Sequence, residues 1–172
     1  PALPEEVSED LLGAIRGWCD HEVAHVLYTD TDLGPAFQEE YGRAAFGILN
    51  ALEDARVERR LAEEYPGSAI NLKDAYRYIS GEADRVGGSD LLTDFTSALY
   101  IRASGREDPD WISPQASRLA DDVSEELDAI PTCESTWDVV DVAERIWMKI
   151  QDRVESAGGG GGNDDSDGTG QG

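Results

Sequence analysis

Hydrophobic residues recur at intervals of three and four along most of this 172-residue chain. That spacing gathers apolar side chains on one face of a helix. It predicts helices over approximately residues 8–28, 35–64, 71–80, 89–103, 114–130 and 135–150. No segment alternates apolar and polar residues with the period of two that marks a strand. The sequence therefore predicts a compact, all-α, multi-helix domain.

Two local signals support the start points of the last two helices. Ser113 stands before Pro114, which matches a capping residue followed by proline in the first helical position. Ser135 is followed three residues later by Asp138, a pattern that resembles a capping box. We therefore expect both helices to begin at these serines.

The character of the chain changes after residue 156. The segment AGGGGGNDDSDGTGQG has no apolar side chain beyond alanine and cannot contribute to a core. The sequence predicts a helical domain over residues 1–156. It predicts a flexible, disordered Gly-rich acidic linker or tail over residues 157–172.

Composition limits the partners that this protein can take. The chain carries 14 basic and 37 acidic residues, a formal net charge of −23. Such a surface repels phosphate backbones, so we expect no nucleic-acid partner. No apolar run reaches 18 residues, so we expect no membrane span. Cys19 and Cys133 form neither a disulfide framework nor a CxxC pair, and two free thiols favour the reducing cytoplasm.

The first predicted helix carries the only two histidines of the chain, in the sequence HEVAH. His21 and His25 are four residues apart, so both imidazoles lie on one helix face and can reach one metal ion. Glu22 is then placed to take a proton from a water molecule at the metal. This is the HExxH pattern of zinc metallopeptidases, and it predicts a Zn²⁺ site with Glu22 as the general base acting on a peptide or protein substrate.

Two histidines do not complete a catalytic zinc site, which usually has three protein ligands. The second predicted helix offers three acids, Glu53, Asp54 and Glu58. At about 100° per residue, Glu53 lies at the edge of the buried arc of this helix and Asp54 lies on its flank. A buried carboxylate needs a partner, so we favour Glu53 as the third ligand and keep Asp54 as the alternative. The acid that does not bind zinc could accept a hydrogen bond from a ligating imidazole.

Each of these features also has a simpler interpretation. HEVAH could be a helix surface with two structural histidines. Glu53 and Asp54 could be ordinary helix acids that pair with nearby arginines, of which the candidates are Arg56, Arg59 and Arg60.

Two segments together resemble a known family. HEVAHVLYTD (21–30) and ILNALEDARVERRL (48–61) are similar to the N-terminal metallopeptidase-like helical region of CobT-type cobaltochelatase subunits and their von Willebrand factor A relatives, including phage and archaeal versions. The resemblance implies a site of His21, Glu22 and His25 completed by Glu53 or Asp54. It also implies a position at the N-terminal end of a larger protein and a MoxR-type AAA+ ATPase as partner, acting through a downstream domain.

Two functions follow from these observations. The first is a zinc-dependent metallopeptidase, in which Glu22 acts as general base. The alternative is a non-catalytic metal-binding or scaffold module of a CobT-like complex working with the ATPase. Classical zinc peptidases hold the substrate backbone against an edge strand, and the sequence predicts no strand.

Overall fold

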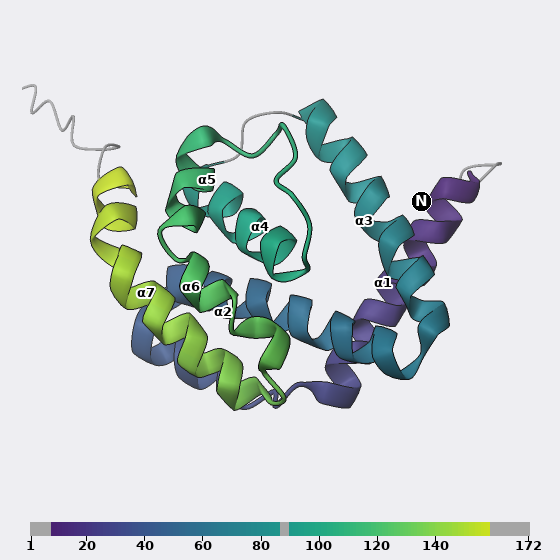
Figure 1. Cartoon of the computed structure of the whole chain (residues 1–172), viewed down its shortest axis with the longest axis horizontal. Coiled ribbons are helices and arrows are strands. Elements are labelled where there is room, and N and C mark those ends of the chain that lie inside the picture. Colours follow the sequence, from purple (N-terminus) through teal and green to yellow (C-terminus); the bar gives the residue numbers. More distant parts are fainter. Residues whose placement is uncertain (1–7, 87–89, 159–172) are drawn as a thin grey trace, which may run out of the picture.

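The computed structural model describes residues 8–86 and 90–158, which form seven α-helices and one short 3₁₀ helix (Figure 1). The elements in chain order are α1 (Glu9–Tyr28), α2 (Leu33–Glu64), α3 (Pro66–Val86), α4 (Leu91–Ala103), α5 (Pro114–Asp121), α6 (Ser124–Leu127), η1 (Ile130–Thr132) and α7 (Thr136–Gly158). These two ranges contain no strand. The all-α prediction is therefore confirmed.

The long helix α2 organises the domain. It packs against α1 and α3 toward one end and against α4 and α7 toward the other (Figure 1). The main hydrophobic core lies among α2, α4, α5 and α7, and includes Ile48, Leu52, Phe95, Leu99 and Ile146. A smaller cluster of Ala24, Val57 and Leu61 joins α1 to α2. The smaller cluster packs α1 across α2, and the HEVAH segment lies at that crossing.

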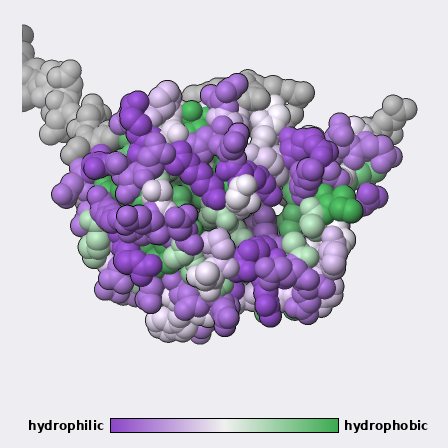
Figure 2. Space-filling model, viewed as in Figure 1, coloured by the Kyte–Doolittle hydropathy of each residue, from purple (hydrophilic) through white to green (hydrophobic). Residues whose placement is uncertain are grey.

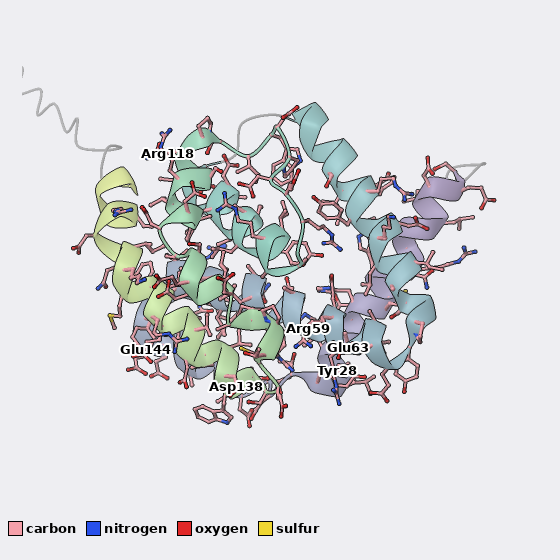
Figure 3. All side chains as sticks on the ribbon, viewed as in Figure 1. Tyr28, Arg59, Glu63, Arg118, Asp138 and Glu144 are labelled. Carbon is pink, nitrogen blue, oxygen red and sulfur yellow. The ribbon has the colours of Figure 1, made fainter. Side chains whose placement is uncertain are left out.

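The capping signals in the sequence act as predicted. The Ser113 hydroxyl accepts a hydrogen bond from the Ala116 N–H, and Pro114 begins α5. At α7, Asp138 Oδ2 accepts from the Ser135 N–H at 2.9 Å while Ser135 Oγ accepts from the Asp138 N–H at 3.3 Å. These hydrogen bonds to Ser135 hold the pKa of Asp138 below its usual value. Asp138 marks the start of α7 in Figure 3.

The boundaries of some predicted helices differ in the structure. The helix expected over 114–130 is broken into α5, α6 and η1, because the chain leaves helical geometry at the buried Val123 (φ −118°, ψ 18°). The third helix begins at Pro66, since proline suits a first turn, and continues past the exposed Gly81 to Val86. The tail predicted over 157–172 lies, from residue 159 onward, outside the described residues.

Gly17 allows α1 and α3 to approach each other closely. A Cβ at this position would lie 2.2 Å from the backbone oxygen of Asn71 and 2.5 Å from Cβ of Ala75. Such distances are far below van der Waals contact, so any larger residue must push the helices apart. Because His21 follows one turn later, this glycine also determines how the face of α1 that carries His21 is positioned.

The visible surface is mostly hydrophilic, and hydrophobic colour gathers over α1 and α3 (Figure 2). The exposed apolar side chains of these two helices include Trp18, Val26, Ile70 and Ile79. Within the described part of the chain, no helix combines the length and apolar character needed to cross a membrane.

Candidate metal centre

His21 and His25 face Asp54 of α2 across the α1–α2 crossing. The Nε2 atom of His25 lies 3.0 Å from Asp54 Oδ1, and the Nε2 atom of His21 lies 4.0 Å from the same oxygen. One possible ligand atom from each of the three residues lies within 4.8 Å of the other two. Two ligand atoms of a tetrahedral zinc ion stand roughly 3.3 Å apart. The three side chains therefore have the spacing of a metal-binding group.

The outward-facing nitrogen of each imidazole has its own partner. His21 Nδ1 lies 2.9 Å from Glu58 Oε1, and His25 Nδ1 lies 2.9 Å from the Thr29 hydroxyl. The hydrogen bond to Glu58, followed by the charge of Asp54, raises the pKa of His21. Partners on Nδ1 fix the ring orientation and direct Nε2 inward, which is how metal-binding histidines are commonly held.

A proton count around His25 supports a cation at this site. The Thr29 hydroxyl donates its only hydrogen to Glu53 Oε1 at 2.9 Å, so it must accept from the Nδ1–H of His25. A neutral imidazole then has a bare lone pair on Nε2, and this lone pair faces Asp54 Oδ1. Two acceptor atoms at 3.0 Å require a proton or a metal ion between them. The donor set of two imidazoles and one carboxylate suits zinc.

Glu53 lies outside this group. It is buried, and Arg56 donates to both of its oxygens, from Nη2 at 2.7 Å and from Nε at 2.8 Å. Its Oε1 also accepts from the hydroxyls of Thr29 and Thr136. The expected burial of Glu53 is present, but its partner is an arginine three residues away, as the simpler interpretation allowed. Asp54, and not Glu53, thus belongs to the group of side chains that could hold a metal ion.

Asp54 is oriented by a neighbour on its own helix. Asn50 Nδ2 donates to Asp54 Oδ2 at 3.2 Å, one turn before it on α2. This contact leaves Oδ1 toward the two imidazoles. One oxygen of the Asp54 carboxylate therefore contacts Asn50 on the same helix, and the other faces the two imidazoles.

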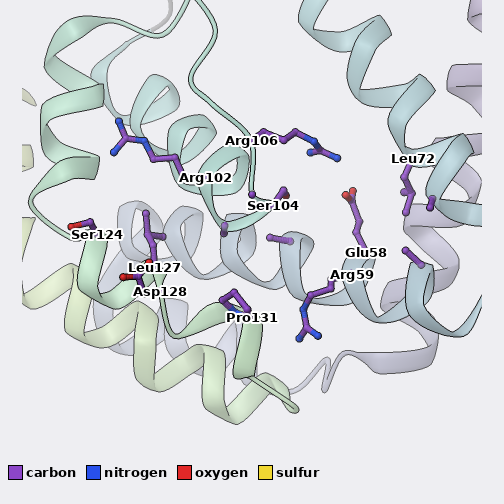
Figure 4. Close-up of a pocket in the computed structure, with 15 residues that line it drawn as sticks. Glu58, Arg59, Leu72, Arg102, Ser104, Arg106, Ser124, Leu127, Asp128 and Pro131 are labelled. Carbon is purple, nitrogen blue, oxygen red and sulfur yellow. The ribbon is translucent and has the colours of Figure 1, made fainter. Parts of the chain in front are cut away.

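Sequence reasoning missed the residues that hold Glu58. The Tyr100 hydroxyl of α4 donates to Glu58 Oε2 at 2.8 Å, and desolvation is the main cause that raises the pKa of Tyr100. Arg106 Nη1 lies 3.5 Å from the same hydroxyl, and its guanidinium stacks over the ring of Tyr76 at 4.3 Å. Arg106 and Glu58 point toward one another in Figure 4. No local motif marks Tyr100 or Arg106, because only the packing of α4 on α2 brings them near His21.

The proposed base, Glu22, has an exposed side chain next to this group. Its charge also contributes to the raised pKa of His21, after Glu58 and Asp54. At about 100° per residue, Glu22 lies about 40° around α1 from Trp18. Its side chain is thus accessible to solvent beside the two histidines.

Two cavities adjoin Glu58. One, of about 630 Å³, has His21, Asp54 and Glu58 in its wall. The other, of about 680 Å³, contains Arg59, Arg102 and Arg106 (Figure 4). Arg59 already pairs with Glu63, its neighbour in Figure 3, and Arg102 pairs with Asp108 and Asp121. Of these two cavities, only the first has residues of the metal-binding group in its wall.

A family model described as "Cobalamin biosynthesis protein CobT" matches residues 1–90, which is more than half of the chain. The chain belongs to the CobT family. The matched range contains His21, His25, Asp54 and Glu58, whereas Tyr100 lies beyond it. Comparisons with curated proteins and with solved structures gave no match. The CobT part of the predicted resemblance is confirmed.

Proposed function

We propose that this CobT-family domain is a zinc-dependent hydrolase of the metallopeptidase type. One observation carries the proposal: the Nε2 atoms of His21 and His25 converge with Asp54 Oδ1, while both Nδ1 atoms are held by hydrogen-bond partners. Asp54 replaces Glu53 as the proposed third ligand. Three protein ligands leave a fourth zinc position open, as catalysis requires.

Zinc held by these residues would polarise a substrate carbonyl and lower the pKa of a water molecule. Glu22 takes the proton from the attacking water and returns it to the leaving amine. Glu58 accepts from His21 Nδ1–H, which keeps the Nε2 lone pair available. Tyr100 in turn holds Glu58 by its hydroxyl.

The test compares Glu22→Gln with wild type for zinc content and for cleavage of a mixed peptide library. We expect the variant to keep about one zinc per chain and to lose roughly 10²- to 10⁴-fold in cleavage rate. The matched control is Glu39→Gln, an exposed acid of α2. Undiminished cleavage, or loss of zinc together with activity, would refute the role of Glu22.

A second candidate function is favoured by the absence of strands in the described ranges. Zinc peptidases commonly bind the substrate backbone along the edge of a sheet, and these ranges contain no such edge. In this alternative the domain binds metal without catalysis and acts as a scaffold in cobalamin biosynthesis, the process named in the family description. The MoxR-type ATPase partner and the cytoplasmic location remain predictions. Zinc binding with no cleavage of any peptide, in wild type and Glu22→Gln alike, would support this alternative.

A further inference from the structure

The cavity beside the metal-binding group is lined mainly by aromatic and aliphatic side chains. Its wall includes Trp18, Phe46, Tyr76, Ile79, Tyr100 and Trp111, with His21 and Asp54 on one side. A volume of about 630 Å³ lies in the range of small-ligand sites, roughly 300–1,000 Å³. Pockets of this kind combine an apolar body with a few polar groups that orient the ligand.

The wall of the cavity includes exposed apolar side chains from α1 and α3. Trp18 of α1 is 39% exposed and Ile79 of α3 is 50% exposed, and both lie in its wall. Exposed apolar residues gathered around a hollow indicate a binding site more than isolated surface residues do. Glu22 follows Trp18 by one helical turn on α1, so its exposed side chain lies near this part of the wall.

Two wall residues carry buried polar atoms without a hydrogen-bond partner. These atoms are Ser80 Oγ and Trp111 Nε1. Buried polar groups are nearly always paired in folded proteins, so each such atom needs an explanation. A peptide brings both N–H and C=O groups and could pair with them.

Charge narrows the class of ligand further. The chain has a net charge of −23, and the acids in the cavity wall are Asp54 and Glu58. A field of this sign attracts cationic ligands and repels acidic ones. The best occupant is therefore an apolar side chain with a basic neighbour.

We propose that this cavity binds a large apolar side chain, preferably aromatic, of a peptide whose adjacent basic residue is attracted by the acidic surface. The inference rests on the proposed peptidase function, because the metal-binding group then faces the bond next to that side chain. It names the specificity of the site, which the HExxH pattern by itself leaves open.

Calorimetric titration tests the proposal with two peptides, acetyl-Ala-Ala-Phe-Arg-amide and acetyl-Ala-Ala-Gly-Arg-amide. Binding is measured on full-length Glu22→Gln protein, with and without zinc, so that turnover does not interfere. We expect the phenylalanine peptide to bind about tenfold or more tightly than the glycine peptide, because an aromatic side chain is buried.

Three variants locate the preference. Ser97→Phe fills the cavity from α4 and should abolish the difference between the peptides, and Ile79→Asp should reduce it. Ile70→Asp is the matched control, since Ile70 is 66% exposed on the same helix and lies outside the cavity wall. Thermal unfolding confirms that each variant is folded.

No binding of either peptide, equal affinities, or a preference that survives Ser97→Phe in folded protein would each overturn the proposal. Failure of the proposed function gives a different result: the wild-type protein would take up no zinc, or it would bind zinc and cleave no peptide. The comparison of peptides on the zinc-free protein would still decide what the cavity binds.

Discussion

Replacing Asp54 and Glu53 one at a time separates the metal site from the fold. In the structure, Asp54 Oδ1 faces both imidazoles, whereas Glu53 is a buried partner of Arg56. We expect Asp54→Ala to lose zinc affinity and keep its stability without metal. We expect Glu53→Ala to lose stability first.

The magnitudes follow from the contacts. Structural zinc contributes about 10–16 kcal/mol through four ligands, or about 3 kcal/mol for each. At about 1.4 kcal/mol per tenfold, Asp54→Ala should weaken zinc binding by roughly 100-fold. Glu53→Ala leaves the charge of Arg56, which is 1% exposed, without its carboxylate. Removing one partner of a buried ion pair typically costs about 3–5 kcal/mol of unfolding free energy.

Two assays give the comparison. Competition with a chromophoric chelator measures zinc affinity, and urea unfolding of the metal-free proteins measures stability. Zinc affinity should fall in Asp54→Ala, and the unfolding midpoint should fall in Glu53→Ala. The reverse pattern, with zinc lost only in Glu53→Ala and stability unchanged there, would refute the assignment of the third ligand.

Three further outcomes are expected. Tyr100→Phe removes the donor to Glu58 and should lower zinc affinity about tenfold in the same competition assay, and an unchanged affinity would show that Glu58 needs no support. Gly17→Ala should cost about 1–3 kcal/mol or more in urea unfolding, because its Cβ meets α3, and a neutral effect would contradict the close helix approach. The pKa of Asp108 is lowered by Arg102, so its contribution is present above the unfolded pKa of about 3.9 and is lost as pH falls through the folded value. Asp108→Asn should therefore unfold more easily than wild type at pH 7, and the difference should shrink as pH falls below about 3.9; a constant difference would show another cause.

The helices could be predicted because their signals are local. Apolar spacing of three and four residues identified each long helix, and Ser113 and Ser135 were recognisable as caps without knowledge of any distant residue. The break at Val123 could not be predicted, since it depends on what lies beneath that buried side chain. The apolar spacing continues through Val123, although the backbone leaves helical geometry at this residue.

The amino-acid sequence by itself determined the helical class and the pairing of His21 with His25, because both depend on residues within a few turns of one helix. It could narrow the proposed third ligand to neighbouring acids, but it could not place either acid relative to the two imidazoles. Glu53 and Asp54 differ by about 100° around α2, and only the crossing of α1 over α2 decides which of them meets the imidazoles. Tertiary packing also decided the surroundings of the site, since Tyr100 reaches Glu58 from a helix 42 residues further along the chain.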